Sequence, residues 1–360
     1  MYANHIYKAN ITKIKRRAYD EIKRKCFEHN GIIFGGFVRD EYICEYYSTK
    51  YNKHYNNSNR YWDIKHSPDT NARLLIAKDI DISFKNQESA NNFIEAVKDI
   101  KEFYEVCVVD RTYNTDNYGN MQYVLASIKQ IFIYLRVGHI PFVNTGFIIS
   151  MSIDVVVPNN PLLQPPFNNL DVLCNGFIMT GEGGKQFSRN TGTIIDHYSD
   201  YERAVVVPQI LKDMFEFKTY ICMTTNTRNR FINIDALKRI KKLFDKNEKW
   251  TILNMPFKKE IYTPEEGCEK YECPICYDSI DNNQVVAYTT SVKETGGEEI
   301  PTDKIHYDCM MRHLDCQIHT ARNWNATTNE HIYTFKCPFR NNISFVRCKL
   351  DIQFAYKTNL

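Results

Sequence analysis

Apolar residues recur at helical spacing along several stretches of the first 250 residues. Within residues 10–29 the apolar side chains return every three to four positions, and Asn30-Gly31 supplies a stop signal. We therefore expect a helix there. The same period predicts helices at residues 37–47, 87–103, 208–218 and 233–246.

Other segments show the period of two that is typical of strands. Residues 79–84 alternate polar and apolar side chains, and a short apolar run at 32–34 precedes a glycine pair. Further strand-like runs lie at residues 105–110, 121–127, 131–137, 147–157 and 171–179. The order helix, strand, helix, strand, helix and then strands predicts an α/β (α+β) fold around a mixed sheet.

Polar segments divide the chain. Residues 48–76 are rich in Asn, Tyr, Ser and Lys and are expected to be an insertion loop, whereas residues 256–267 look like a linker. We therefore predict a first domain over residues 1–205, a short helical extension over 206–255 and a small cysteine-rich domain over 268–350.

Composition adds little to this picture. Hydrophobic residues make up 43% of the 360-residue chain and the net charge is only +3, so basic clusters at residues 13–25 and 238–242 indicate solvated helix faces or a phosphate-binding face. No apolar stretch of about 18 residues and no signal-peptide pattern occur, so we expect an intracellular protein in the cytoplasm or nucleus, without a membrane segment. The abundance of Asn, Ile, Lys and Tyr suggests an A/T-rich genome, as in some protists and large DNA viruses.

Three aspartates are candidate metal ligands. Asp79 and Asp81 alternate along one predicted strand, so their carboxylates point to the same face, and Asp154 lies within another apolar strand. If these strands are neighbours, the carboxylates converge and need cations, for which two Mg²⁺ ions are suitable. Gly35-Gly36, between a strand and a helix, allows backbone N–H groups to approach a triphosphate. The alternative is a solvated aspartate pair and an ordinary turn.

These pieces resemble one family when taken together. The segment from Gly35 to Asp40 resembles the Gly-Gly-x-Val-Arg-Asp opening of CCA-adding enzymes and bacterial poly(A) polymerases, in the DNA polymerase beta superfamily. Residues 79–81 are similar to the metal-binding Asp-x-Asp of that family, and residues 171–175 to its Asp-Phe-Thr-Ile-Asn segment. The resemblance implies a nucleotidyltransferase fold that binds a nucleoside triphosphate. The catalytic, metal-binding residues would be Asp79, Asp81 and Asp154, and the nucleotide-binding residues Gly35, Gly36, Arg39, Asp40, Asp171 and Asn175.

The sequence also departs from that family. Forty-two residues separate Gly36 from Asp79, and Asn169-Leu170 replaces an arginine pair that holds the nucleotide in the family. The long helical body of the family is reduced to about residues 208–248. A simple tailing enzyme, or a relative that has lost activity, is therefore expected rather than an enzyme that measures tRNA.

Seven of the 12 cysteines follow residue 260. Cys273-Pro-Ile-Cys276 is a zinc knuckle, and the later spacing resembles a RING finger of ubiquitin ligases, which binds two zinc ions. Lys304 and Arg340 occupy ligand positions of the second zinc site of that family, so this site is expected to be lost. The resemblance leaves one zinc ion. Its expected ligands are Cys273, Cys276, Cys309 and His313, with Cys316 as the next choice and with His306 and Cys337 without metal. The alternative is that the knuckle thiols bind no metal.

Two hypotheses of function follow. The first is a Mg²⁺-dependent nucleotidyltransferase that acts on a nucleic acid 3′ end, such as that of RNA, or on a protein hydroxyl, with the zinc domain as a targeting module. The second is a RING-type ubiquitin ligase or adaptor whose first domain is inactive and binds the target. In that case Ile275 and Pro338 would face a ubiquitin-conjugating enzyme. A weaker third interpretation is a structural protein.

Overall fold

The computed structural model describes most, but not all, of the chain. It divides into two compact units, Met1–Phe215 and Glu216–Leu360, called here the N-terminal and C-terminal units and described separately. The described residues are 2–51, 79–111, 125–137, 147–167, 170–182, 184–220, 222, 242–243, 249–253, 258–264, 271–288, 290–291, 300–301, 304–318, 322–325 and 330–333.

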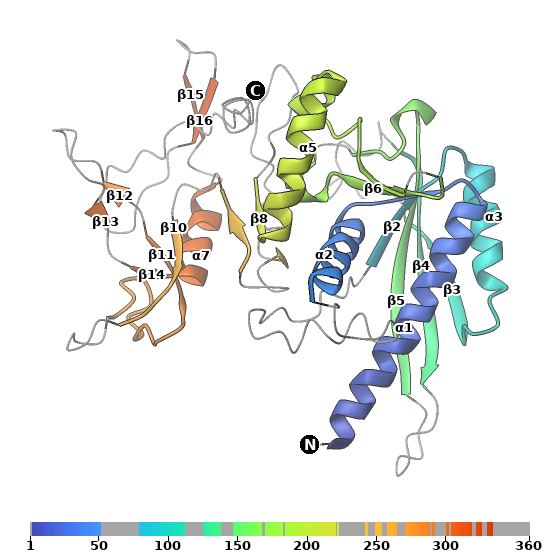
Figure 1. Ribbon diagram of the computed structural model, residues 1–360, viewed down its shortest axis with the longest axis horizontal. Helices are drawn as coiled ribbons and strands as arrows, with labels where there is room; N and C mark the ends of the chain where they lie inside the picture. Colours follow the sequence, from blue (N-terminus) through green and yellow to red (C-terminus); the bar gives the residue numbers. More distant parts are fainter. Residues whose placement is uncertain are drawn as a thin grey trace. The chain divides into compact units, whose positions relative to one another are not determined.

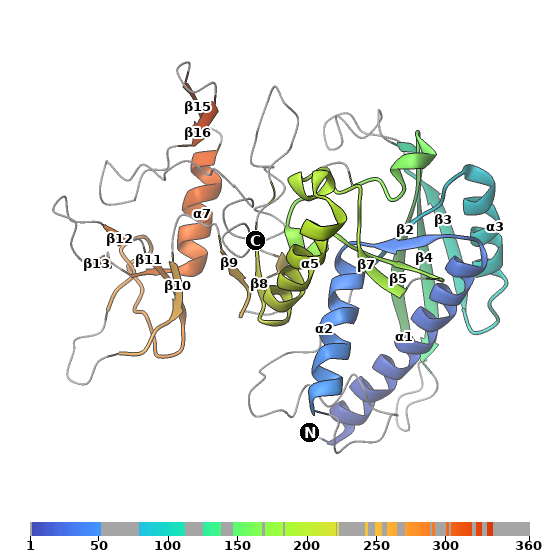
Figure 2. The same cartoon turned by 45° about the horizontal axis from the view of Figure 1, so that its top comes forward.

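The N-terminal unit is built on a seven-stranded mixed sheet (Figures 1 and 2). The strand order is β3-β4-β5-β2-β1-β6-β7, in which β2 and β5 pair in parallel and the other neighbours pair antiparallel. This confirms the predicted α+β class. The strands are β1 (Ile32–Phe34), β2 (Asp79–Ser83), β3 (Glu105–Asp110), β4 (Leu125–Val137), β5 (Phe147–Pro158), β6 (Phe177–Thr180) and β7 (Gly184–Phe187).

Four α-helices are described in this unit: α1 (Tyr2–Glu28), α2 (Gly36–Tyr51), α3 (Gln87–Lys98) and α5 (Asp200–Phe215). Three short 3₁₀ helices, η3 (Pro161–Leu163), η4 (Leu173–Asn175) and η5 (Ile194–His197), lie in the connections. Helix α3 begins where the Asn86 side chain accepts a hydrogen bond from the Ser89 N–H, as an N-cap does. The helix predicted at 87–103 is thus present as α3, but it ends at Lys98.

The two faces of the sheet differ because strand side chains alternate. Helices α1, α2 and α3 pack on one face, which holds the core. Its isoleucines at 33, 80, 82, 131, 133 and 153 are fully buried. The intervening residues, including Asp81 and Asp154, point to the opposite face. The hydrophobic core therefore fixes which side of the sheet carries the candidate carboxylates.

Several element boundaries differ from the sequence-based expectation. The strands expected at 121–127 and 131–137 belong, from residue 125 onward, to one strand, β4, with a register shift between Leu125 and Ser127; residues 121–124 lie outside the described part. Helix α2 continues to Tyr51 and so takes in the first residues of the expected insertion loop; residues 52–78 lie outside the described part. The run near 171–179 is divided between η4 and β6.

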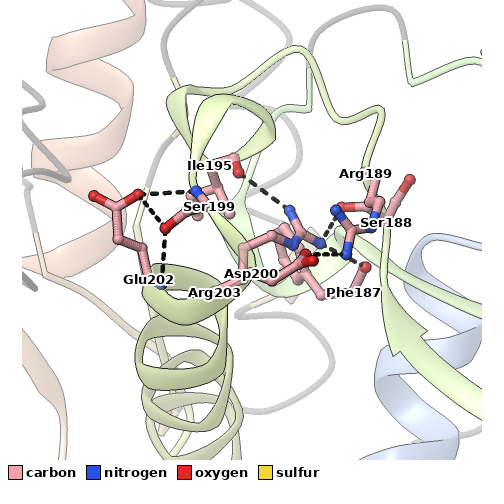
Figure 3. A network of polar contacts seen from close by, with 8 residues as sticks. All are labelled: Phe187, Ser188, Arg189, Ile195, Ser199, Asp200, Glu202 and Arg203. Carbon is pink, nitrogen blue, oxygen red and sulfur yellow. Dashed lines mark hydrogen bonds and ion pairs between the residues drawn. The ribbon is translucent and has the colours of Figure 1, made fainter.

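Helix α5 begins earlier than its apolar period suggested. Ser199 precedes it as the N-cap, and its backbone and hydroxyl both donate to the Glu202 carboxylate, while the Glu202 N–H returns a bond to the serine hydroxyl (Figure 3). Arg203 then donates to the backbone oxygens of Phe187, Ser188 and Ile195 at 2.9–3.1 Å. These bonds attach the helix to the end of β7 and to η5.

In the C-terminal unit, a small antiparallel sheet of order β10-β11-β14 packs with α7 (Tyr307–Ile318). Its strands are β10 (Lys258–Ile261), β11 (Val285–Tyr288) and β14 (Ile305–His306). The expected linker at 256–267 was therefore wrong for Lys258–Ile261. The shorter strands are β8 (Lys218–Thr219), β9 (Thr251–Ile252), β12 (Thr290–Ser291), β13 (Ile300–Pro301), β15 (Arg322–Asn325) and β16 (Glu330–Tyr333).

Of the helix predicted at 233–246, only residues 242–243 are described, and both are helical. Within the described part of the chain, no helix combines the length and apolar character needed to cross a bilayer.

Candidate active site and metal centre

The register of β2 and β5 brings two of the candidate aspartates together. Asp81 lies directly opposite Asp154 in this parallel pair, and Asp79 lies opposite Ser152. Residues opposite each other share a face, so the alternation of strand residues places all three aspartates at positions on the face away from the buried isoleucines. Asp81 and Asp154 are half-buried and Asp79 is exposed. The three aspartates therefore share one face of the sheet, but their carboxylate oxygens do not form a group within 4.8 Å of one another, so the predicted convergence on one cation is not seen.

Gly35 lies beside this row of carboxylates. Its backbone has φ +75°, the left-handed region, and a Cβ atom placed there would be only 3.2 Å from Asp81 Oδ2. The Gly35 N–H donates to the Phe177 oxygen at 3.2 Å, and α2 begins at the next residue. The glycine thus brings the first turn of a helix close to a carboxylate, which a larger residue would obstruct.

A network of polar side chains joins the two segments of candidate nucleotide-binding residues, 39–40 and 171–175. The Arg39 guanidinium is paired with Asp40 at 2.6 Å and donates to Asn175 Oδ1 at 2.6 Å. Asn175 Nδ2 donates in turn to Asp171 Oδ1, 3.1 Å away. The structure therefore brings together four residues that the sequence selected as nucleotide-binding: Arg39, Asp40, Asp171 and Asn175.

The burial of Arg39 and Asp40 makes this polar network important for stability. Arg39 is 3% exposed and Asp40 is 1% exposed. Burial, the largest single effect, would lower the pKa of Arg39, but the charge and hydrogen bond of Asp40 together with the contribution of Cys174 raise this pKa above its ordinary value. Breaking such a pair would leave one uncompensated buried charge, which typically costs about 3–5 kcal/mol. Arg39 therefore supports the loop from within and does not project into solvent.

The last three basic residues of the basic segment of α1 pair with acids on neighbouring turns. Arg24 pairs with Glu21 at 2.7 Å, Lys25 with Glu28 at 3.1 Å, and Lys23 with Asp20 at 2.9 Å. Such pairs are typical of a solvated helix surface. They favour that interpretation over a phosphate-binding face. The second basic segment, at 238–242, is described only at Lys242.

The C-terminal unit contains a group of ligand atoms suited to a metal ion. Cys273, Cys276, His306 and Cys309 each contribute one donor atom, and these atoms all lie within 4.8 Å of one another. Cys273 and Cys276 lie on a turn closed by the bridge between Glu272 and Ser279. His306 ends β14, and Cys309 lies in the first turn of α7. Three sulfurs and one nitrogen are a common donor set for tetrahedral zinc.

The ligand atoms of this Cys3His cluster lie close to one another. Cys276 Sγ lies 3.3 Å from His306 Nδ1, and the His306 backbone N–H donates to Cys273 Sγ at 3.4 Å. In a tetrahedral zinc site, with Zn–S about 2.3 Å and Zn–N about 2.0 Å, neighbouring sulfur and nitrogen ligands lie about 3.5 Å apart. The residues therefore fit a metal ion of that size.

The metal-free thiols have different acidities. Burial would raise the pKa of Cys273, but backbone N–H groups of Cys276, Ile275 and His306 outweigh it and lower that pKa. Burial raises the pKa of Cys309 to about 12, and the neighbouring thiols add to the effect. A cation at the centre of the cluster would favour the thiolate form of all three cysteines.

The expected fourth ligand was wrong. We predicted that His313 would complete the set and that His306 would be without metal, but His306 is the residue that joins the three cysteines. The pairing of Val286 with His306 places the latter at the end of β14, three residues before Cys309 in the first turn of α7. His313 lies four residues beyond Cys309, about 6 Å farther along the helix axis. The cluster therefore combines the Cys273/Cys276 pair with His306 and Cys309, and not with Cys309 and His313 as the RING resemblance implied.

The other candidates have separate outcomes. Among the described residues, which include all three aspartates, only the Cys3His cluster brings three or more His, Cys, Asp or Glu ligand atoms within 4.8 Å of one another. The next choice, Cys316, is exposed. Lys304 pairs with Glu260 at 2.8 Å. Cys337, Pro338 and Arg340 lie outside the described residues.

Sequence reasoning did not identify Gln284, whose side-chain oxygen lies 2.9 Å from His306 Nε2. No motif marks it, because the contact depends on the pairing of β11 with β14. Comparisons with protein-family models, with curated proteins and with solved structures found no match for this chain.

Proposed function

We propose that the N-terminal unit is a Mg²⁺-dependent nucleotidyltransferase that transfers a nucleotide to a nucleic acid 3′ end, such as that of RNA, or to a protein hydroxyl. The observation that carries this proposal is the pairing of Asp81 with Asp154 beside Gly35. Carboxylates alone would be an ordinary polar sheet face. Their position next to a left-handed glycine at a helix start adds a place for phosphate groups.

The donor set is suited to magnesium. Carboxylate oxygens are the ligands that Mg²⁺ takes in proteins, and this ion usually keeps waters and substrate phosphates as its remaining ligands. Two bound Mg²⁺ ions would supply activation of the acceptor hydroxyl and stabilisation of the leaving pyrophosphate. The exposed position of Asp79 leaves space on that side for a substrate.

The residues of this unit would have distinct roles. Asp79, Asp81 and Asp154 would bind metal, and the N–H groups following Gly35 and Gly36 would bind the triphosphate. Arg39 is buried against Asp40 and Asn175, so we assign it to positioning this loop rather than to direct contact with the nucleotide. Asp171 extends the same support through Asn175.

The test is incubation of the full chain with each labelled nucleoside triphosphate and RNA, with and without Mg²⁺. We expect Mg²⁺-dependent incorporation that is abolished in the Asp79→Asn/Asp81→Asn double variant and in Asp154→Asn. The fold should survive, because removing like charges relieves repulsion in the metal-free state. Asp110→Asn is the matched control, because Asp110 is an exposed strand aspartate of the same sheet, paired with Lys129. Undiminished incorporation in the double variant would contradict the proposal.

We further propose that the Cys3His cluster binds one Zn²⁺ per chain and builds a targeting module. A second candidate function, a ubiquitin ligase or adaptor, is supported by the knuckle surface, where Tyr277 is 77% exposed and Ile275 is half-buried. Exposed aromatic residues commonly anchor protein partners. An absence of incorporation with every nucleotide, together with ubiquitin transfer by the zinc-loaded chain, would favour this second function.

A further inference from the structure

We propose that Gln284 is an outer-sphere residue of the Cys3His centre, whose carboxamide oxygen holds His306 with Nδ1 directed at the metal. The inference rests on the metal centre proposed above and is independent of nucleotidyl transfer. It assigns a role to a residue that lies outside the ligand set and precedes strand β11.

The orientation of the Gln284 amide is fixed by its two contacts. The Asp281 backbone N–H can only donate, and it lies 2.9 Å from Gln284 Oε1. The same oxygen lies 2.9 Å from His306 Nε2. Since a carbonyl oxygen only accepts, His306 must carry its proton on Nε2 to form this bond.

The tautomer that follows is the one that a metal ligand needs. A neutral imidazole protonated on Nε2 has its lone pair on Nδ1, and Nδ1 is the atom that lies 3.3 Å from Cys276 Sγ within the cluster. Hydrogen bonds of this kind fix the ring orientation of metal-bound histidines and increase their basicity. Gln284 thus prepares His306 to bind through Nδ1.

The same residue connects the metal centre with the sheet. The Gln284 backbone oxygen accepts from the Tyr262 N–H at 2.8 Å, and its N–H donates to the Asp281 oxygen at 3.1 Å. These bonds hold the turn at residues 281–284, just before β11, and attach it to Tyr262, the residue that follows β10. A metal ion on His306 would therefore stabilise this turn through Gln284.

The test measures metal affinity of the full chain by Co²⁺ and Zn²⁺ titration. Thiolate-to-cobalt absorption reports the cysteine site alone, because carboxylate sites give no such band. We expect Gln284→Leu to weaken binding about 10–100-fold, the usual effect of losing such a partner. Gln284→Glu, which keeps an acceptor, should bind at least as tightly as the wild type. Asn282→Ala, an exposed residue of the same turn, is the control and should bind as the wild type does.

A His306→Cys background separates an outer-sphere role from a merely structural one. A cysteine ligand has no ring N–H to donate, so Gln284→Leu should leave the affinity of that background unchanged. An equal loss in both backgrounds would show that Gln284 only shapes the turn. Selective ¹⁵N labelling of histidine gives a second measurement. In the zinc-loaded wild type, His306 should be protonated on Nε2 and metal-bound at Nδ1, and the opposite assignment would overturn the proposal.

If the wild type shows no thiolate-to-cobalt absorption, the metal centre itself is wrong. If it binds cobalt but Gln284→Leu does not change the affinity, the metal centre stands and the role of Gln284 is wrong. Neither outcome affects the nucleotidyltransferase proposal, which is tested in the other unit.

Discussion

At the scale of single residues, Gly35 is constrained by both its backbone and its surroundings. Its φ of +75° disfavours any residue with a Cβ atom, at a cost of about 1–2 kcal/mol. The 3.2 Å approach to Asp81 Oδ2 adds a steric conflict on the side where a triphosphate would bind. The first cost concerns stability and the second concerns the site, so the two can be separated by experiment.

Gly184 provides the matched comparison, because it has φ +65° and no atom lies within 4 Å of the position that a Cβ would take. We expect Gly35→Ala and Gly184→Ala to lower the free energy of unfolding by similar amounts, about 1–2 kcal/mol. Only Gly35→Ala should also weaken binding of a nucleoside triphosphate in the presence of Mg²⁺. Denaturant unfolding and equilibrium nucleotide binding measure the two effects. Equal nucleotide affinity in both variants would remove Gly35 from the site.

At the scale of elements, Arg203 fastens helix α5 to two other segments. Its side chain donates to three backbone oxygens, on Phe187, Ser188 and Ile195, and all four residues are buried. Buried carbonyl groups that lose their partner cost about 1–3 kcal/mol. Nearby, Arg189 and Asp200 pair on the exposed surface, where screening by water leaves little net stabilisation.

Arg203→Met should therefore destabilise the N-terminal unit by at least about 2 kcal/mol. The methionine keeps much of the apolar stem and removes only the donors. Arg189→Met, at the exposed pair, should leave the unfolding midpoint almost unchanged. Chemical denaturation followed by circular dichroism compares the variants. A small effect of Arg203→Met would mean that water replaces the guanidinium at these oxygens.

The helical period was sufficient to predict α1, α2 and α3, because their apolar faces pack on one side of the sheet. It did not predict the start of α5, where Ser199 and Glu202 form a cap that apolar periodicity does not register. It also divided β4 into two strands at residues 128–130, although these residues pair with β5 in unbroken register.

For the two candidate sites, the sequence predicted those features that depend on a single helix or strand. The shared face of Asp79 and Asp81 follows from the period of two, but the pairing of Asp81 with Asp154 depends on the register of two strands that lie far apart in the chain. The same limit explains the error at His313. The RING-like spacing made it the expected ligand, whereas the pairing of β11 with β14 is what brings His306 to the cysteines.

At the scale of the whole molecule, the chain has two compact units that offer different candidate ligand atoms for metal ions. The N-terminal unit presents carboxylate oxygens, and the C-terminal unit presents thiols and an imidazole. Hard cations such as Mg²⁺ prefer the first set and zinc prefers the second. Each site can therefore be altered without changing the ligands of the other.

This separation allows the corrected ligand set to be tested by zinc content. We expect one zinc ion per chain in the wild type and in His313→Ala, and loss of that zinc in His306→Ala, because three thiolates alone leave the tetrahedral site incomplete. Elemental analysis of the purified chain gives the count. Removing zinc with a chelator, or with acid that protonates the ligands, should unfold the region around the cluster, since metal binding contributes directly to folding in small zinc domains. The thermal transition of the N-terminal unit should stay where it is. Zinc retained in His306→Ala but lost in His313→Ala would restore the ligand set that the RING spacing implied.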